Sequence, residues 1–111
     1  MMTTVAQQIL AECHEDYVGL WSIVRRIRHE GIPEGTNIID TTLGLLLPLL
    51  ASREIIAGQF KDNKFREWKL GPKEVIAKIA AEWKELGHDP DIGEIAWFTS
   101  EQGLYKTAEL T

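Results

Sequence analysis

The stretch at residues 40–68, DTTLGLLLPLLASREIIAGQFKDNKFREW, decides the fold. Its first half is apolar almost throughout and predicts a helix that opens at Thr41, with Asp40 as the N-cap. Pro48 has no amide hydrogen for the carbonyl of Gly44 and crowds that carbonyl, at a cost of about 3 kcal/mol in a helix interior. The helix is therefore expected either to kink at Pro48 or to consist of two short pieces.

The second half of the stretch predicts a β-hairpin, because β-branched and aromatic residues at 54–60 and 64–68 flank a polar tip at 61–64. Gly58, inside the first strand, indicates a bulge or a close approach of another backbone segment. A helix followed by a hairpin is the second half of a winged helix. We therefore predict an α+β, winged-helix-like fold, in which helices pack around a small antiparallel sheet and the hairpin forms the wing.

Two helical patterns precede this stretch. Thr4 and Gln7 fit a capping box and open a helix expected over about 4–13. Apolar residues then recur at helical spacing in a second helix expected over about 16–29. No Gly or Pro separates the two patterns, so one bent helix is an alternative, although Asp16 as an N-cap favours a break.

Three further elements are expected after the hairpin. A proline at the first helical position and a glycine just past the end bound a helix over about 72–86. Alternating residues at 92–99 predict a third strand, and Leu104 with Ala108 suggests a short closing helix. The expected order of elements is α-α-α-β-β-α-β-α.

Length and composition indicate one globular domain. With 111 residues, of which 44% are hydrophobic and 26% charged, residues 1–111 are expected to form a single core. The single cysteine, Cys13, excludes an intrachain disulfide, and its acidic neighbours raise a thiol pKa, so no reactive thiolate is expected. The longest apolar run, residues 43–51, is about half of a membrane span, and the N-terminus lacks the features of a secretory signal. We therefore expect a soluble, cytoplasmic protein.

Two resemblances to known proteins support the fold. Residues 98–103, FTSEQG, resemble the strand-to-helix ending of winged-helix regulators of the MarR and PadR kind, in which a hydrophobic residue precedes T-x-x-x-G. Residues 16–104 also resemble a group of small bacterial proteins of unassigned function, which implies a winged-helix-like fold and no site. The chain departs from MarR and PadR proteins in lacking a basic recognition surface. The matching features of the bacterial group are residues 16–21, Thr42, Leu43, Leu49, Leu50, Gly58, Trp68, the helix that bears Trp83, and residues 89–98.

Protein contact is the preferred functional hypothesis. If the other core-facing leucines of the central helix are buried, Leu45 and Leu49 point towards solvent, and this leucine ridge needs a cover. The cover is either the N-terminal helix of the same chain, a second copy in a homodimer, or another protein. Residues 82–111 also carry seven Asp and Glu against two Lys and Arg, which gives either a docking surface for a basic partner or, more simply, a solubilising face.

DNA binding is the alternative, because a winged helix places the helix at residues 41–52 in the major groove. That helix contains no Arg, Lys, Asn or Gln to read base edges. The candidate nucleic-acid contacts lie instead on the wing, where Lys61, Lys64 and Arg66 are able to neutralise phosphates. A DNA-binding transcriptional regulator with weak or partner-assisted DNA contact is therefore ranked second.

No motif points to a catalytic, cofactor or metal site. The three histidines are scattered without ligand spacing, and no nucleophile elbow is present. The tryptophans lie on apolar faces of four expected elements: Trp21, Trp68, Trp83 and Trp97. A shared core is a better explanation for them than a stacking platform for single-stranded nucleic acid, whose groove should also be basic. We therefore predict a non-enzymatic domain without cofactor or metal.

Overall fold

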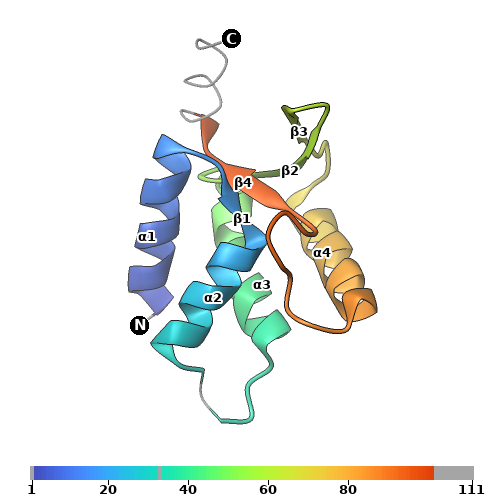
Figure 1. The fold of residues 1–111 in the computed structure, drawn as a ribbon. Helices are drawn as coiled ribbons and strands as arrows, with labels where there is room; N and C mark the ends of the chain where they lie inside the picture. The colour runs from blue at the N-terminus through green and yellow to red at the C-terminus, as the bar shows by residue number, and fades with distance from the viewer. Residues whose placement is uncertain (1, 33, 102–111) are drawn as a thin grey trace.

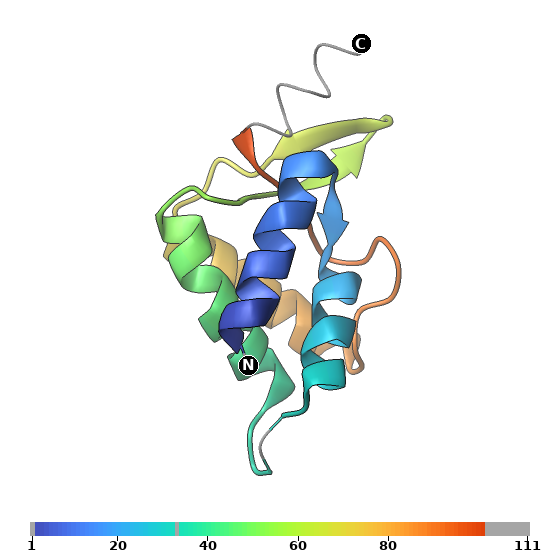
Figure 2. The same ribbon diagram turned by 90° about the vertical axis from the view of Figure 1, so that its left-hand side faces the viewer.

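The computed structural model of the chain describes residues 2–32 and 34–101. The four strands form one antiparallel sheet in the order β1-β4-β2-β3, and the helices lie on one side of it (Figures 1 and 2). The predicted α+β class with a small antiparallel sheet is confirmed. The elements are α1 (Met2–Glu15), β1 (Val18–Gly19), α2 (Leu20–Glu30), α3 (Ile38–Ala51), β2 (Ile56–Lys61), β3 (Lys64–Glu67), α4 (Pro72–Leu86) and β4 (Trp97–Thr99).

The N-terminal region contains two separate helices, so the single bent helix is excluded. Asp16 does not cap the second helix; its carboxylate accepts a hydrogen bond from the backbone amide of Tyr17 at 2.7 Å. The chain then forms β1, which pairs with β4 so that Val18 lies opposite Phe98. The predicted start of the second helix at residue 16 is therefore wrong, because α2 begins only at Leu20, after Val18 and Gly19 have formed a strand whose partner lies far along the chain.

The helix α3 runs through Pro48 as one element, so the expectation of two short pieces is wrong. Its N-cap is Asn37 rather than Asp40. The side-chain oxygen of Asn37 accepts hydrogen bonds from the amides of Ile39 at 2.8 Å and Asp40 at 3.4 Å. The earlier start brings Ile38 and Ile39 into the helix, and both pack against the core.

The predicted hairpin is confirmed as β2 and β3. Asp62 and Asn63 at its tip have φ angles of 55° and 63°, as a two-residue type I′ turn requires. Pairing runs without interruption past Gly58, so the glycine does not mark a bulge. A Cβ atom at Gly58 would lie 2.3 Å from the carbonyl oxygen of Arg66, which confirms the predicted close approach of backbone.

The helix α4 has the predicted boundaries. Pro72 occupies its first turn, and Gly87 ends it in the left-handed conformation with φ 79°. At its start, the carboxylate of Glu74 accepts a hydrogen bond from the amide of Gly71 at 3.0 Å. Both ends of this helix were therefore set by local signals.

The strand β4 is shorter than the predicted strand at 92–99. A tight turn precedes it, in which the amide of Ala96 donates to the carbonyl of Glu94 at 2.9 Å and Ile95 has φ 68°. The turn redirects the chain, so only Trp97–Thr99 pair in the sheet. The predicted closing helix at Leu104 and Ala108 lies outside the described residues.

The core lies between the helices and the face of the sheet that they cover. Cys13 is fully buried there, and burial, followed by the charge of Glu12, raises the pKa of its thiol to about 12. The direction of this shift agrees with the expectation from the sequence, although burial and not the acidic neighbours is its main cause. No helix in the described part of the chain is long and apolar enough to span a membrane. The fully buried large side chains include Ile9, Leu20, Ile23, Ile27, Leu46, Ile55, Ile79 and Phe98.

Candidate docking surface

The expected leucine ridge on α3 is not formed. Leu49 is only 8% exposed and belongs to the core, while Leu45 is half-buried and packs against it. The physical reason is that α3 packs against both α2 and α4, so two of its sides are covered within the chain. Leu45 and Leu49 therefore form no free apolar ridge.

The sheet presents aromatic side chains on the face that the helices do not cover. Side chains alternate between the two faces of a strand, so the burial of Phe98 in the core directs Trp97 outward. Trp97 lies opposite Gly58, and two residues further along β2 the same alternation places Phe60 outward. Phe65 lies opposite Phe60 in β3 and joins it on this face.

Ring contacts join these side chains to Tyr17, which precedes β1. The ring of Phe60 lies 4.9 Å from that of Tyr17, 5.9 Å from that of Phe65 and 5.3 Å from that of Trp97, in edge-to-face arrangements. Tyr17 and Phe65 are 5.1 Å apart. Aromatic pairs at these distances stabilise each other by about 0.5–1.5 kcal/mol beyond burial, so the rings form one cluster.

Two glycines allow rings to lie directly on the sheet. A Cβ at Gly58 would lie 2.7 Å from Cζ of Phe65, and a Cβ at Gly19 would lie 2.5 Å from Cδ1 of Trp21. Trp21 is the second residue of α2, yet its indole covers the backbone of β1 on the same face as the cluster, because Gly19 pairs with Trp97. We use the name aromatic face for the five side chains Tyr17, Trp21, Phe60, Phe65 and Trp97.

The aromatic face is partly open to solvent. Phe60 is 40% exposed, and the other four side chains are half-buried. All four described helices lie on the opposite side of the sheet (Figures 1 and 2). An exposed apolar surface of this kind marks an interaction site more often than a scattered apolar residue does.

No family model, no curated protein and no solved structure matches this chain. Evidence for function therefore comes from the chain's own surfaces.

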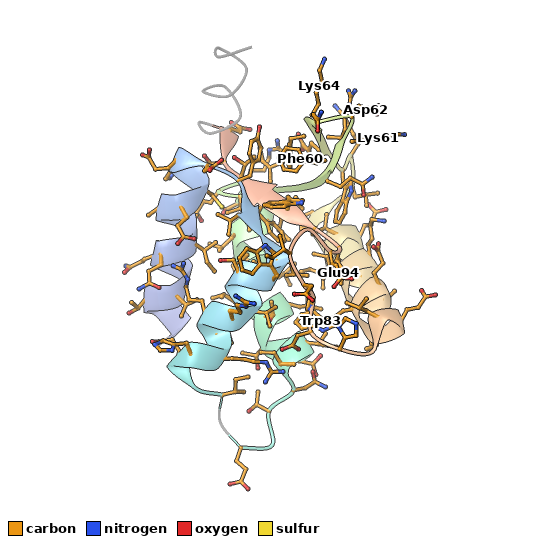
Figure 3. All side chains as sticks on the ribbon, in the orientation of Figure 1. Phe60, Lys61, Asp62, Lys64, Trp83 and Glu94 are labelled. Carbon is orange, nitrogen blue, oxygen red and sulfur yellow. The ribbon has the colours of Figure 1, made fainter. Side chains whose placement is uncertain are left out.

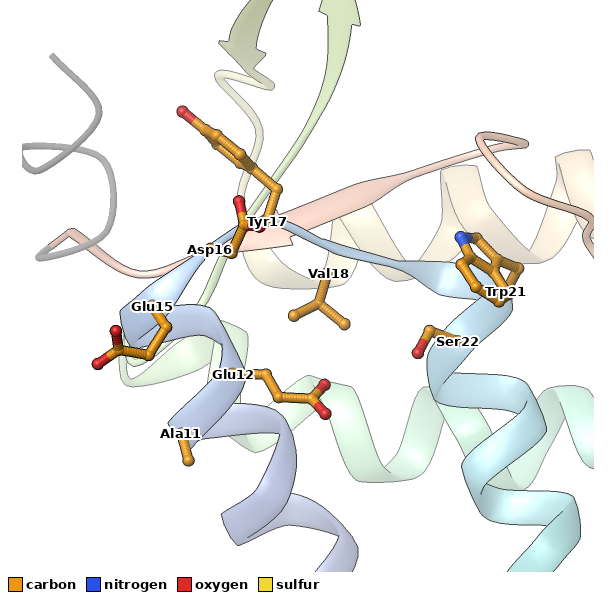
Figure 4. A pocket seen from close by; sticks show the side chains of 8 residues that line it. All are labelled: Ala11, Glu12, Glu15, Asp16, Tyr17, Val18, Trp21 and Ser22. Carbon is orange, nitrogen blue, oxygen red and sulfur yellow. The ribbon is translucent and has the colours of Figure 1, made fainter. Parts of the chain in front are cut away.

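A pocket of about 400 Å³ opens next to the aromatic face, between the end of α1 and the start of α2. Tyr17 and Trp21 belong both to the pocket and to the face. In Figure 4 the side chain of Glu12 extends from α1 towards α2, and the indole of Trp21 lies on the far side of the pocket. The lining residues are Ala11, Glu12, Glu15, Asp16, Tyr17, Val18, Trp21 and Ser22.

Two arginines of α2 border this pocket. Arg26 forms an ion pair with Glu12, and the guanidinium of Arg25 lies 5.0 Å from the centre of the Trp21 ring. The Nε1 atom of Trp21 is buried and has no hydrogen-bond partner among the described residues. Three of the lining residues are acidic, but in Figure 4 only the side chain of Glu12 extends into the pocket, and Arg26 pairs with it.

The register of the hairpin brings together the cations that the sequence analysis singled out. Lys61 lies opposite Lys64, and Arg66 lies opposite Gln59, all with exposed side chains. Alternation along the strands places these residues on the hairpin face opposite that of Phe60. Figure 3 shows Lys61 and Lys64 at the tip of the hairpin. The basic and aromatic surfaces of the hairpin are therefore separate.

The prediction that the four tryptophans share the core is wrong for two of them. Trp83 is 2% exposed in the core, and Trp68 packs against the core while half-buried. Trp21 and Trp97 instead belong to the aromatic face. Their position depends on the pairing of β1 with β4, which no local pattern indicates.

The histidines do not converge. The Nδ1 atom of His14 lies 3.1 Å from the hydroxyl of Ser100, and that of His88 lies 2.8 Å from the carbonyl of Asp89. Within residues 2–32 and 34–101, no group of three or more His, Cys, Asp or Glu side chains is placed to hold a metal ion. The aromatic face and its pocket are thus the main candidate site.

Proposed function

We propose that this chain is a non-enzymatic, winged-helix-like domain that acts by holding a partner protein against its aromatic face. The observation that carries the proposal is the exposure of Phe60, at 40%, in the middle of a cluster of packed rings. The order of α3 followed by the hairpin β2 and β3 supports the winged-helix-like part of the proposal.

Preorganisation favours binding at this face. The rings of Tyr17, Phe65 and Trp97 hold Phe60 from different sides, so its side chain loses little conformational freedom when a partner covers it. Aromatic side chains are also enriched at protein interfaces and among the residues that dominate binding energy. The face thus supplies the apolar contact surface that the leucines of α3 do not.

Peptide selection tests this proposal. A random-peptide library displayed on phage is selected on the immobilised chain, and the enriched peptides are measured against variants by calorimetry. We expect Phe60→Ser to weaken their binding about tenfold or more, as loss of a central aromatic anchor does. The matched control is Ile92→Ser, which removes a side chain that is 68% exposed in the loop before β4 and should leave binding unchanged.

The selection also has an outcome that contradicts the proposal. If no enriched peptide loses affinity in Phe60→Ser, while circular dichroism shows that the variant is folded, the aromatic face is not a docking surface. Sedimentation of the wild type separates a homodimer from a binder of other proteins. A dimer that Phe60→Ser dissociates would identify a second copy as the partner.

DNA binding is the second candidate, favoured by the placement of Lys61, Lys64 and Arg66 on one face of the wing. The helix α3 contains no Arg, Lys, Asn or Gln, so contact would be mainly with phosphates. We expect any binding of duplex DNA in a mobility shift at low salt to disappear by roughly 0.2 M salt and to be abolished by Lys61→Glu with Lys64→Glu. Binding that this double variant retains would rule out the wing as the contact.

A further inference from the structure

We infer that β3 receives an extended segment of the partner protein as a fifth strand, and that this segment alternates acidic and apolar side chains. The inference rests on the proposed function, since it names the binding mode and the chemistry of that partner. It depends on three properties of β3: its place in the sheet, its free backbone groups and the different side chains on its two faces.

The place of β3 in the sheet leaves one of its sides open. It is the last strand in the order β1-β4-β2-β3, and among the described strands it pairs only with β2. In Figures 1 and 2 the hairpin projects beyond the helices, so no described helix lies beside this edge. An open edge presents unpaired backbone groups to which another chain can add a strand.

The hairpin register determines which backbone groups are free. The two residues that flank a two-residue turn form a hydrogen-bonded pair, and such pairs alternate with non-hydrogen-bonded ones along antiparallel strands. The amide of Trp68 donates to the carbonyl of Ala57 at 3.0 Å, in step with this alternation. The N–H and C=O groups of Phe65 and Glu67 therefore point to the open edge of β3.

One face of β3 is basic. Lys64 and Arg66 are exposed on it, and Lys61 lies opposite Lys64 on β2 (Figure 3). None of these three cations forms an ion pair with a described residue, so their charges are available to a partner. Four other cations of the chain do form ion pairs: Arg26, Arg28, Arg53 and Lys78.

The other face of β3 is apolar, because Phe65 belongs to the aromatic face. An added strand sets every second side chain on this side, next to Phe65. Neighbouring strands lie about 4.8 Å apart, so a bulky apolar side chain there covers Phe65 and reaches Phe60, whose ring centre lies 5.9 Å from that of Phe65. The intervening side chains face Lys64 and Arg66, where opposite charges stabilise the pairing. The bound segment should therefore alternate apolar and acidic residues.

A second copy of the chain fits this edge less well. If two β3 strands pair antiparallel through the open groups of Phe65 and Glu67, Arg66 lies opposite its own counterpart. The two shifted registers set Lys64 opposite Arg66, or one Glu67 opposite the other. Like charges directly opposite destabilise a sheet, and lysines on edge strands commonly prevent copies from pairing. The same cations thus oppose self-association and select an acidic segment.

A nucleic-acid strand also fits less well. Its phosphates would meet Lys64 and Arg66, but it offers no regular series of donors and acceptors for the open amides and carbonyls of β3. The cations and the aromatic rings also lie on opposite faces of the hairpin. An extended polypeptide has side chains on both of its faces and can therefore cover both surfaces at once.

Backbone methylation of the bound peptide tests the binding mode. The probes are the phage-selected peptides whose binding depends on Phe60, synthesised with one N-methyl amide at a time. In strand addition only every second amide of the peptide donates to β3. Methylation should therefore weaken binding about tenfold or more at alternate positions and have little effect at the positions between them.

A proline in β3 tests the same contact from the side of the domain. Glu67→Pro removes an amide donor from the open edge, where proline is tolerated because the ladder with β2 does not use that amide. We expect it to weaken peptide binding about tenfold. Glu67→Gln is the matched control, since it loses the ion pair with Arg53 as well but keeps the amide. Circular dichroism checks that the proline variant is folded, and the methylation series on the wild type does not depend on it.

Charge substitution tests the chemistry of the partner. We expect the selected peptides to be enriched in Asp or Glu at alternate positions. Their affinity should fall about tenfold for Lys64→Gln with Arg66→Gln. The matched control is Lys73→Gln with Lys84→Gln, at exposed positions of α4, which changes the net charge equally and should leave affinity unchanged.

The outcomes separate this inference from the proposed function. Phe60-dependent peptides that tolerate methylation at every amide, or that bind the Lys64→Gln, Arg66→Gln variant as tightly as the wild type, overturn the inference and leave the docking face in place. A wild-type dimer that Glu67→Pro dissociates identifies a second copy as the occupant and also overturns it. If duplex DNA, and no selected peptide, loses affinity for the Lys64→Gln, Arg66→Gln variant, the occupant is a nucleic acid and the inference is wrong. The absence of any Phe60-dependent peptide overturns the proposed function itself.

Discussion

Gly58→Ala is expected to lower the free energy of unfolding by about 3 kcal/mol, measured by urea denaturation. The added Cβ would lie 2.3 Å from the carbonyl oxygen of Arg66 and 2.7 Å from Cζ of Phe65. The first of these atoms is backbone in the paired strand, so it cannot move without disturbing the pairing of β2 with β3. The ring of Phe65 would also be lifted from the sheet, which disturbs the aromatic face.

Gly44→Ala is the matched control and should have the opposite sign. Gly44 is exposed inside α3, and a Cβ there would meet nothing within 4 Å. Alanine in a helix interior is favoured over glycine by about 0.5–1 kcal/mol, so this variant should be slightly more stable than the wild type. Equal effects of the two substitutions would show that Gly58 is not held against the neighbouring strand.

The elements that the sequence predicts well are those with local signals at both ends. Proline and glycine bound α4, and the polar pair Asp62 and Asn63 fixes the tip of the hairpin. These signals act within a few residues, because they depend on backbone φ angles and on amides without partners. The helix α3 was also predicted, although both Asn37 and Asp40 are suitable N-cap residues for it.

Burial of apolar side chains in the core decides whether Asn37 or Asp40 is the N-cap of α3. Either side chain can accept hydrogen bonds from amides at a helix start. Capping by Asn37 places Ile38 and Ile39 in the helix, where both pack against the core. Capping by Asp40 would leave them in the preceding loop, so burial of apolar surface selects the earlier start.

The central part of the sheet could not be predicted in this way. The two residues of β1 are too few for a period to show, and their partner β4 follows almost eighty positions later in the chain. The pairing turns Trp97 and Tyr17 to the open side of the sheet. Without knowledge of this pairing, a tryptophan on an apolar pattern is more simply assigned to the core. This explains why the sequence analysis wrongly placed Trp21 and Trp97 in the core.

Two of the five side chains of the aromatic face could have been found from the hairpin alone. A two-residue tip at Asp62 and Asn63 fixes the register and sets Phe60 opposite Phe65 on one face. The same register sets the cations on the other face. The sequence cannot tell which of these faces points to the helices, because that direction is fixed by Phe98 in β4.

Phe98→Ala is expected to destabilise the fold by about 3–5 kcal/mol, the range for removal of a fully buried phenylalanine. Phe98 is 0% exposed and lies in β4 between β1 and β2, so its removal leaves a cavity under the middle of the sheet. Phe60→Ala removes the same side chain from the opposite face, where it is 40% exposed. We expect it to destabilise the fold by only about 1 kcal/mol, since it loses ring contacts without opening a buried cavity.

The difference between these two variants decides what the aromatic face contributes. Under the docking proposal, the rings around Phe60 contribute little to folding and their apolar area is available to a partner. Urea denaturation of both variants should then give unfolding free energies that differ by at least about 2 kcal/mol. If Phe60→Ala is as destabilising as Phe98→Ala, the aromatic face functions as a second core whose area is needed for folding, and a partner has little reason to bind it.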